Sequence, residues 1–286
     1  MSSLTLSTGL VVCLLGLCLG SFANVVITRL PVMLMRHWRL EARAARAALE
    51  LPMEQAPRFN IATPRSQCPR CESSIAWHDN IPLIGWVKRR GRCANCHTRI
   101  SLQYPLVELS SGVLALTVAL LQGINLSSLF IYAACVTLLV LAVIDLRTYL
   151  LPDVLTLPLL WAGLVYQLLF QPYLLTNAVV GAMVGYLILW SFYWLFKLTT
   201  GKEGMGYGDF KLLAALGAWL GWSFLPLLLL LSAGIGAVVG VVAQTRFPHL
   251  RGAPLPFGPF LALAGWACLL AGHDLIALYL SFFPGV

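Results

Sequence analysis

The chain has 286 residues, of which 59% are hydrophobic and only 10% are charged, and its mean hydropathy is +0.83. A soluble domain carries roughly 25% charged residues, so this composition excludes an ordinary soluble protein and indicates an integral membrane protein. Lys and Arg total 19 against 11 Asp and Glu, a formal net charge of +8, and thirteen of the 19 lie between Arg29 and Arg99. The positive-inside rule therefore predicts that this hydrophilic segment is cytoplasmic and that the N-terminus lies outside.

The first apolar run, residues 9–27, is predicted to be a retained transmembrane span. No basic region precedes it and no small-residue cleavage site follows it, which argues against a cleaved signal peptide. A helix is then predicted over residues 33–50, where arginines recur on one face and apolar residues on the other. The basic face would bind anionic lipid, dock a substrate, or form the solvated side of a helix packed on the loop domain. Its arginines are Arg36, Arg39, Arg43 and Arg46.

Two Cys-x-x-Cys pairs follow in the same hydrophilic segment. Their spacing is typical of four thiolates that hold one tetrahedral ion. Because a cytoplasmic compartment keeps thiols reduced, we expect a structural zinc site rather than two disulfides, with the metal supplying folding energy to a small domain. His78 and His97 are alternative ligands, although four cysteines already complete a tetrahedral shell. The four cysteines are Cys68, Cys71, Cys93 and Cys96.

From residue 104 onward the chain is almost continuously apolar, and short polar or Gly/Pro interruptions divide it into seven predicted spans. With the first span, they predict an all-α polytopic membrane protein of about eight transmembrane helices. If residues 30–103 are cytoplasmic, alternation of the spans places all six remaining basic residues at cytoplasmic ends. The basic cluster 88–92 then acts as a topology determinant, and no nucleic-acid partner is expected. The seven spans are 105–122, 126–144, 154–171, 174–196, 209–222, 224–244 and 257–283.

Three acids, Asp145, Asp153 and Asp209, fall at ends of these spans, and the alternation brings all three to the cytoplasmic face. A carboxylate at the margin of hydrocarbon is costly, so such an acid is a functional-site candidate. Asp209 follows the glycine-rich segment 204–208, whose backbone would allow a sharp turn and a close approach of substrate main chain. Spacing leaves either upstream acid open as its partner, although Asp153 also suits a first-turn acid on the next helix.

Two carboxylates at close range share a proton, so one can act as acid and the other as base. A water held between them can attack a peptide carbonyl, with the ionised carboxylate taking its proton and the protonated one donating to the carbonyl oxygen. The pattern therefore predicts a paired-carboxylate protease in a membrane. The simpler alternative places Asp145 and Asp209 in surface ion pairs.

Two tracts, Ile144 to Asp153 and Gly206 to Lys211, resemble the bacterial type 4 prepilin peptidases, a family of Gly-x-Gly-Asp membrane aspartyl proteases. The paired cysteines in a cytoplasmic loop after the first span match the larger members of that family, and the similarity covers most of the chain. This resemblance, rather than spacing, selects Asp145 and Asp209 as the catalytic pair.

The resemblance implies a bifunctional enzyme of the bacterial inner membrane with a periplasmic N-terminus. Such an enzyme removes the short basic leader of type IV prepilins or type II secretion pseudopilins at the cytoplasmic face, then N-methylates the new terminus using S-adenosylmethionine. Smaller relatives that lack the cysteine loop are peptidases without methylation, which implicates the loop in the second reaction. No residues are assigned to the methyl donor. The expected domains are 1–30 (first span), 31–103 (cytoplasmic zinc domain) and 104–286 (peptidase bundle).

Acidic groups that could receive a basic leader are few, because the loop is net basic. Asp79, Glu108 and Glu203 are the candidates. In the last apolar run, His273 and Asp274 either shorten the span or face the bundle interior.

Two other interpretations of the intramembrane acids remain. The first is a presenilin-like intramembrane protease, which would cut inside a substrate's apolar helix rather than before it. The second is an ion-coupled transporter, which would favour paired repeats with broken spans.

Overall fold

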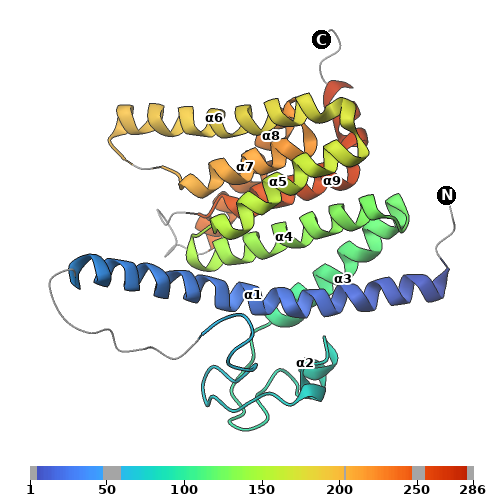
Figure 1. The fold of residues 1–286 in the computed structure, drawn as a ribbon, viewed down its shortest axis with the longest axis vertical. Helices are drawn as coiled ribbons and strands as arrows, with labels where there is room; N and C mark the ends of the chain where they lie inside the picture. Colours follow the sequence, from blue (N-terminus) through green and yellow to red (C-terminus); the bar gives the residue numbers. More distant parts are fainter. Residues whose placement is uncertain (1–4, 48–58, 203, 247–254, 282–286) are drawn as a thin grey trace. The chain divides into compact units, whose positions relative to one another are not determined.

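The computed structural model of the chain describes residues 5–47, 59–202, 204–246 and 255–281. Over these residues the chain is mostly helical and contains no β-strand, which confirms the predicted all-α fold class. It forms two compact units, Met1–Leu120 and Leu121–Val286, whose helices are labelled in Figure 1. The α-helices are α1 (Leu6–Ala47), α2 (Ile84–Lys88), α3 (Gln103–Gln122), α4 (Leu126–Thr148), α5 (Asp153–Phe170), α6 (Leu175–Thr200), α7 (Tyr207–Leu220), α8 (Leu225–Arg246) and α9 (Gly258–Ser281). The division of the chain at residues 30 and 103 stays a prediction.

Each predicted span corresponds to one helix. Among the described residues, six helices are long and apolar enough to cross a membrane, namely α1, α3, α4, α5, α6 and α8. The other two are shorter: α7 has 14 residues and the apolar part of α9 covers Gly258–Gly272. Fourteen residues of helix extend about 21 Å, less than the roughly 30 Å of a bilayer core. These two helices therefore depend on protein rather than lipid around part of their length.

The helix α1 joins two elements that the sequence predicted separately. It runs without interruption for 42 residues through Pro31, so the first span and the basic helix after it are one helix. At the usual helical rise it extends about 63 Å, twice the thickness of a bilayer core. Its C-terminal half therefore carries the chain well beyond the hydrocarbon. The last predicted residues of the basic helix, 48–50, lie outside the described residues.

In the first unit, α1 and α3 approach closely through small residues. An ideal Cβ built on Gly16 would lie 2.7 Å from the Ala115 Cβ, and one on Gly20 would lie 2.8 Å from the Ser111 Cβ. The Ser111 hydroxyl donates a hydrogen bond to the Gly16 carbonyl (2.7 Å). Small residues with one polar contact are a usual way to pack helices that share a membrane. Asn24, the polar residue of the first span, is buried and donates to the Tyr104 carbonyl (3.0 Å).

In the second unit, α7 is the buried central helix. It packs against α5, α6 and α9, and all residues from Asp209 to Trp219 except Lys211 are buried. Because neighbouring helices cover it, its short length leaves little of its backbone or side chains facing lipid. Two glycines bring it against α6: an ideal Cβ on Gly217 would lie 2.2 Å from the Gly181 carbonyl oxygen. The indole of Trp219 donates to the Leu159 carbonyl of α5 (2.9 Å).

The last helix bends near its middle. Ala271 has non-helical backbone angles (φ −132°, ψ 27°), so α9 consists of two helical pieces. Asp274, just after the bend, is exposed, which favours a shortened apolar span over an acid that faces the bundle interior. The side chain of His273 lies outside the described part of the structure.

Candidate functional site

Asp145 lies in the last turn of α4 and is buried, with 5% of its surface exposed. The helix ends soon after it because Tyr149 adopts a left-handed conformation (φ 55°), and the Tyr149 amide donates to the Asp145 carbonyl (2.9 Å). The Asp145 carboxylate accepts a hydrogen bond from the backbone N–H of Gly258, the first residue of α9 (Oδ2 to N, 3.0 Å). A buried acid needs such partners, and this one comes from a helix far along the sequence.

Asp209 lies in the first turn of α7 and is 7% exposed. Its backbone N–H donates to the carbonyl of Gly206, the residue before the helix (3.2 Å). Gly206 has φ −82° and ψ 148°, an extended conformation open to any residue, so the predicted sharp turn does not occur at this glycine. Within the described part of the chain, no group hydrogen-bonds the Asp209 Oδ1 atom. That oxygen is free to accept a hydrogen bond from a substrate or a water.

The two acids share one buried cluster. Asp209 interacts electrostatically with Asp145. Leu151, in the loop after α4, lies against the start of α7 and the start of α9. An ideal Cβ built on Gly208 would lie 2.6 Å from the Leu151 Cβ, and one built on Gly258 would lie 3.2 Å from the Leu151 Cδ1. The end of α4 and the starts of α7 and α9 therefore converge. This convergence places Asp145 and Asp209 in one buried region, and their catalytic pairing stays a prediction.

Asp153, the other possible partner of Asp209, has a different role in the structure. It is the first residue of α5, and its carboxylate is 54% exposed. Both of its oxygens accept hydrogen bonds from Lys211 Nζ of α7, each at 2.7 Å. This ion pair joins the start of α5 to the start of α7. It gives Asp153 a structural role as an acid in the first turn of its helix.

The four cysteines of the first unit form a compact cluster. Their sulfur atoms all lie within 4.8 Å of one another. The Cys68 and Cys96 sulfurs are 3.7 Å apart, and those of Cys71 and Cys93 are 3.9 Å apart. Tetrahedral zinc, with bonds of about 2.3 Å, separates two sulfurs by roughly 3.8 Å. The cluster therefore fits a tetrahedral metal site, and all four cysteines are free thiols rather than disulfides.

Both cysteine pairs sit in turns of the same construction. The amide of the first cysteine donates to a carbonyl five residues later, Cys68 to Ser73 (3.0 Å) and Cys93 to Thr98 (2.9 Å). The residue after the second cysteine is left-handed in each turn, Glu72 in one and His97 in the other. This arrangement turns both thiols of a pair toward one point. A hydrogen bond with Ser73 lowers the pKa of Cys71 to about 6, which favours the thiolate that metals bind.

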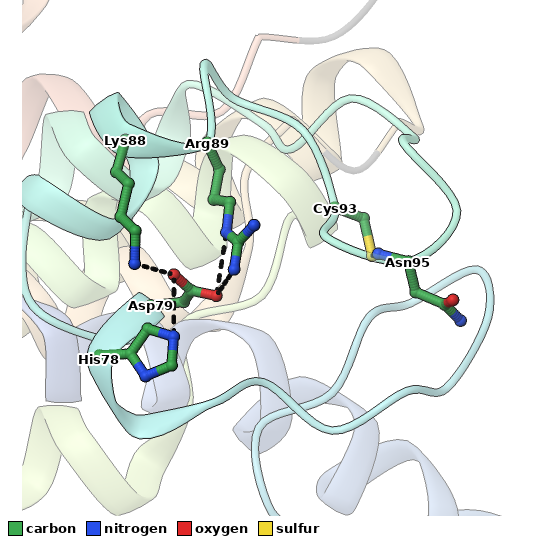
Figure 2. A network of polar contacts seen from close by, with 6 residues as sticks. All are labelled: His78, Asp79, Lys88, Arg89, Cys93 and Asn95. Atoms are coloured by element: carbon green, nitrogen blue, oxygen red, sulfur yellow. Dashed lines mark hydrogen bonds and ion pairs between the residues drawn. The ribbon is translucent and has the colours of Figure 1, made fainter.

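A charged network braces the segment between the two pairs (Figure 2). Arg89 donates two hydrogen bonds to the Asp79 Oδ2 atom (2.6 and 3.0 Å), and Lys88 donates one to Oδ1 (3.2 Å). The Arg89 hydrogen bonds lower the pKa of Asp79 to about 2. Arg89 immediately follows α2, so the network fastens this short helix to the turn at Trp77–Asp79.

The candidate receivers of a basic leader have other partners. Asp79 is held by Arg89 and Lys88. Glu108 of α3 is 7% exposed, and its Oε2 atom accepts a hydrogen bond from the Leu83 amide (2.8 Å). Glu203 lies outside the described residues. Asp79 and Glu108 therefore serve internal contacts of the first unit.

Two contacts of the acid cluster were not foreseen from the sequence. The sequence did not connect the Gly258 amide with Asp145, and it did not predict that Lys211 binds Asp153. Pro259 directly after Gly258 is a signal for a helix start, because proline suits the first helical turn. No spacing rule, however, pairs two residues so far apart in the chain.

These features define a polytopic helical membrane protein with a buried two-carboxylate cluster and a separate four-thiol cluster. Residues 14–122 match the family model described as bacterial peptidase A24 N-terminal domain, and residues 132–241 match that of the type IV leader peptidase family. The second match includes both Asp145 and Asp209. No solved structure was found to match the chain.

Curated relatives cover nearly the whole chain. A protein of Aeromonas salmonicida (strain A449) is 51% identical over 94% of this chain and 92% of its own length. Similar proteins of Aeromonas hydrophila (50% identical, 94% and 93% covered) and Pseudomonas aeruginosa (48%, 94% and 92%) carry the same name, prepilin leader peptidase/N-methyltransferase. This chain belongs to the prepilin leader peptidase/N-methyltransferase family. The comparisons favour neither the presenilin-like protease nor the transporter.

Proposed function

We propose that this chain cleaves the leader peptide of type IV prepilins or type II secretion pseudopilins and then N-methylates the new N-terminal residue. The observation that carries the peptidase assignment is the buried cluster of Asp145 and Asp209, in a chain about half identical to proteins named for that activity. The catalytic roles of the two acids are our proposal.

The two carboxylates would hydrolyse the peptide bond as a pair that holds one proton. The ionised carboxylate takes a proton from a water molecule as the water oxygen attacks the scissile carbonyl carbon, and the other carboxyl group donates its proton to the carbonyl oxygen. When the carbon–nitrogen bond breaks, the leaving amine receives a proton from the pair. Two products result: a leader with a new carboxyl terminus and a mature pilin with a free amine.

The surroundings of the two acids support a different role for each carboxylate. Asp145 Oδ2 is held by the Gly258 amide, whereas no described group holds Asp209 Oδ1. Asp145 is thus the fixed member, and Asp209 offers an oxygen to the reacting water or the substrate. Asp153 takes no part in this scheme, because Lys211 occupies both of its oxygens.

The four-cysteine cluster would hold a structural zinc ion. Cys68, Cys71, Cys93 and Cys96 are its ligands in this proposal, and the sulfur separations support that set. Bound zinc would supply folding energy to a segment with few buried side chains, and four protein ligands leave no open position for a substrate. We assign it no catalytic step.

The methylation reaction would use S-adenosylmethionine as a cosubstrate. The free amine of the mature pilin attacks the methyl carbon, the carbon–sulfur bond breaks, and the amine loses a proton. Support for this activity comes from the names of the relatives and from the match to the N-terminal family model, which covers the cysteine cluster. No residue is assigned to the methyl donor.

We place the protein in the bacterial inner membrane, with its N-terminus periplasmic and its cysteine loop cytoplasmic. The charge distribution supports this orientation, since thirteen of the 19 basic residues lie between Arg29 and Arg99. The acid cluster is then at the cytoplasmic face. The expected domains remain a first span over 1–30, a cytoplasmic domain over 31–103 and a peptidase bundle over 104–286.

One incubation tests both activities. Purified protein in lipid vesicles is mixed with a prepilin and radiolabelled S-adenosylmethionine, and leader loss and methyl incorporation are followed together. We expect the precursor to shorten and the label to appear only in shortened product. Intact precursor after prolonged incubation would refute the peptidase proposal, and shortened but unlabelled product would refute the methyltransferase proposal.

A further inference from the structure

We propose that Gly258 is a positioning residue for peptide cleavage: its backbone amide and its lack of a side chain together fix the carboxylate of Asp145 toward Asp209. This inference rests on the proposed peptidase function and adds a residue to it. Gly258 is buried and begins α9, whereas Asp145 lies in the last turn of α4.

The first argument is the hydrogen bond. The Gly258 N–H donates to Asp145 Oδ2 at 3.0 Å. The first amides of a helix have no partner within the helix and carry the positive end of its dipole, so they are good donors for a carboxylate. A carboxylate held by one oxygen loses rotational freedom about its terminal torsion. Asp145 is therefore presented in a single orientation.

The second argument is steric. An ideal Cβ on Gly258 would lie 2.6 Å from Asp145 Oδ2 and 3.1 Å from its Cγ, and also 3.2 Å from Leu151 Cδ1. Ordinary contact begins near 3.4 Å, so the carboxylate would have to retreat by roughly 0.8 Å. Leu151 limits movement on one side. Any side chain at position 258 thus displaces the acid that the amide holds.

The displacement predicts a loss of rate rather than of affinity. A shift of about 1 Å in a catalytic group can lower the rate roughly 100-fold, while contacts with the rest of a substrate remain. Gly258→Ala should therefore lower kcat by about 100-fold and change KM by less than about threefold. Because alanine keeps the backbone N–H, this variant leaves the hydrogen-bond donor in place and tests only whether the Asp145 carboxylate needs the space beside residue 258.

Another glycine of α9 provides a matched control. An ideal Cβ on Gly265 would also lie 2.6 Å from its nearest neighbour, but that atom is Leu216 Cδ2 of α7 and not an acid. Gly265→Ala introduces the same methyl group into the same helix with the same nominal overlap. If Gly258 acted only in helix packing, the two variants would lower kcat equally.

The experiment measures prepilin cleavage by the full-length protein in lipid vesicles. The wild-type protein must cleave the prepilin, and the Asp209→Asn variant must not. An inactive wild type or an active Asp209→Asn variant would overturn the proposed function rather than this inference. With those conditions met, we expect Gly258→Ala to fall about 100-fold below Gly265→Ala in kcat, with similar KM and melting temperature. A kcat within threefold of Gly265→Ala would overturn the positioning role.

A second measurement does not depend on the folding of Gly258→Ala. In protein labelled with ¹⁵N-glycine, the Gly258 amide resonance should move when Asp145→Asn replaces its charged acceptor, whereas the Gly265 resonance should stay in place. An unmoved Gly258 resonance would overturn the proposed contact.

Discussion

The packing of α7 against α6 gives a prediction whose sign can be worked out from the structure. Gly217 of α7 and Gly181 of α6 approach through their backbones: an ideal Cβ on Gly217 would lie 2.2 Å from the Gly181 carbonyl oxygen and 2.5 Å from its carbon. These are backbone atoms of a long helix, which cannot rotate away as a side chain can. Gly217→Ala should therefore separate the two helices by roughly 1 Å.

Two opposing effects set the magnitude. Overpacking of a well-packed interior costs about 1–3 kcal/mol. Alanine in place of glycine within a helix recovers about 1 kcal/mol through its better helix propensity. Backbone crowding is at the expensive end of the first range, so the net destabilisation should be about 1–2 kcal/mol.

Gly234 in α8 is the matched control, because an ideal Cβ there meets no atom within 4 Å. Gly234→Ala should be neutral or stabilising by up to about 1 kcal/mol. Unfolding in detergent would be followed by thiol labelling of Cys135, which is fully buried in α4. Replacing glycine with alanine should therefore destabilise the protein at position 217 but not at position 234. A Gly217→Ala protein that unfolds no sooner than Gly234→Ala would refute the proposed packing.

Two further predictions concern the first unit. Cys68→Ser should lose bound zinc and destabilise the loop, because three thiolates do not complete the tetrahedral shell; unchanged zinc by elemental analysis would contradict the ligand set. Asp79→Asn should destabilise the same segment by an amount that stays constant from pH 7 to pH 5. The folded pKa is lowered to about 2 from an ordinary 3.8, so the stabilisation is complete above about pH 4 and lost only as the pH falls toward 2. A deficit that stays unchanged in denaturant titrations as the pH falls from 4 toward 2 would show that this pKa is not depressed.

Much of the fold could be predicted from the sequence because helices and paired cysteines are encoded by residues close together in the chain. Apolar runs predicted each α-helix described from residue 103 onward, and the cysteine spacing predicted the four-thiol cluster. The separation of the first span from the basic helix was wrong. Pro31 does not end α1, which agrees with the tolerance of membrane helices for an internal proline.

The contacts of the acid cluster could not be predicted in the same way, because they join segments that are far apart in the sequence. Composition and spacing placed Asp145 and Asp209 at helix ends on one face, but neither could reveal that Gly258 holds Asp145 or that Lys211 holds Asp153. Such pairs depend on how helices pack in three dimensions. The glycines near Asp209 illustrate the same limit: Gly208 is helical, and its bare backbone accommodates Leu151 of the same chain.

The most direct test of the account compares three single substitutions in the prepilin cleavage assay. Asp145→Asn and Asp209→Asn should each abolish leader removal while the protein remains inserted and folded, because neither altered pair can both accept and donate the proton. Asp153→Asn should retain substantial activity, since this acid forms an exposed ion pair. A folded Asp153→Asn protein without activity, or an active Asp145→Asn or Asp209→Asn protein, would contradict the assignment of the catalytic pair.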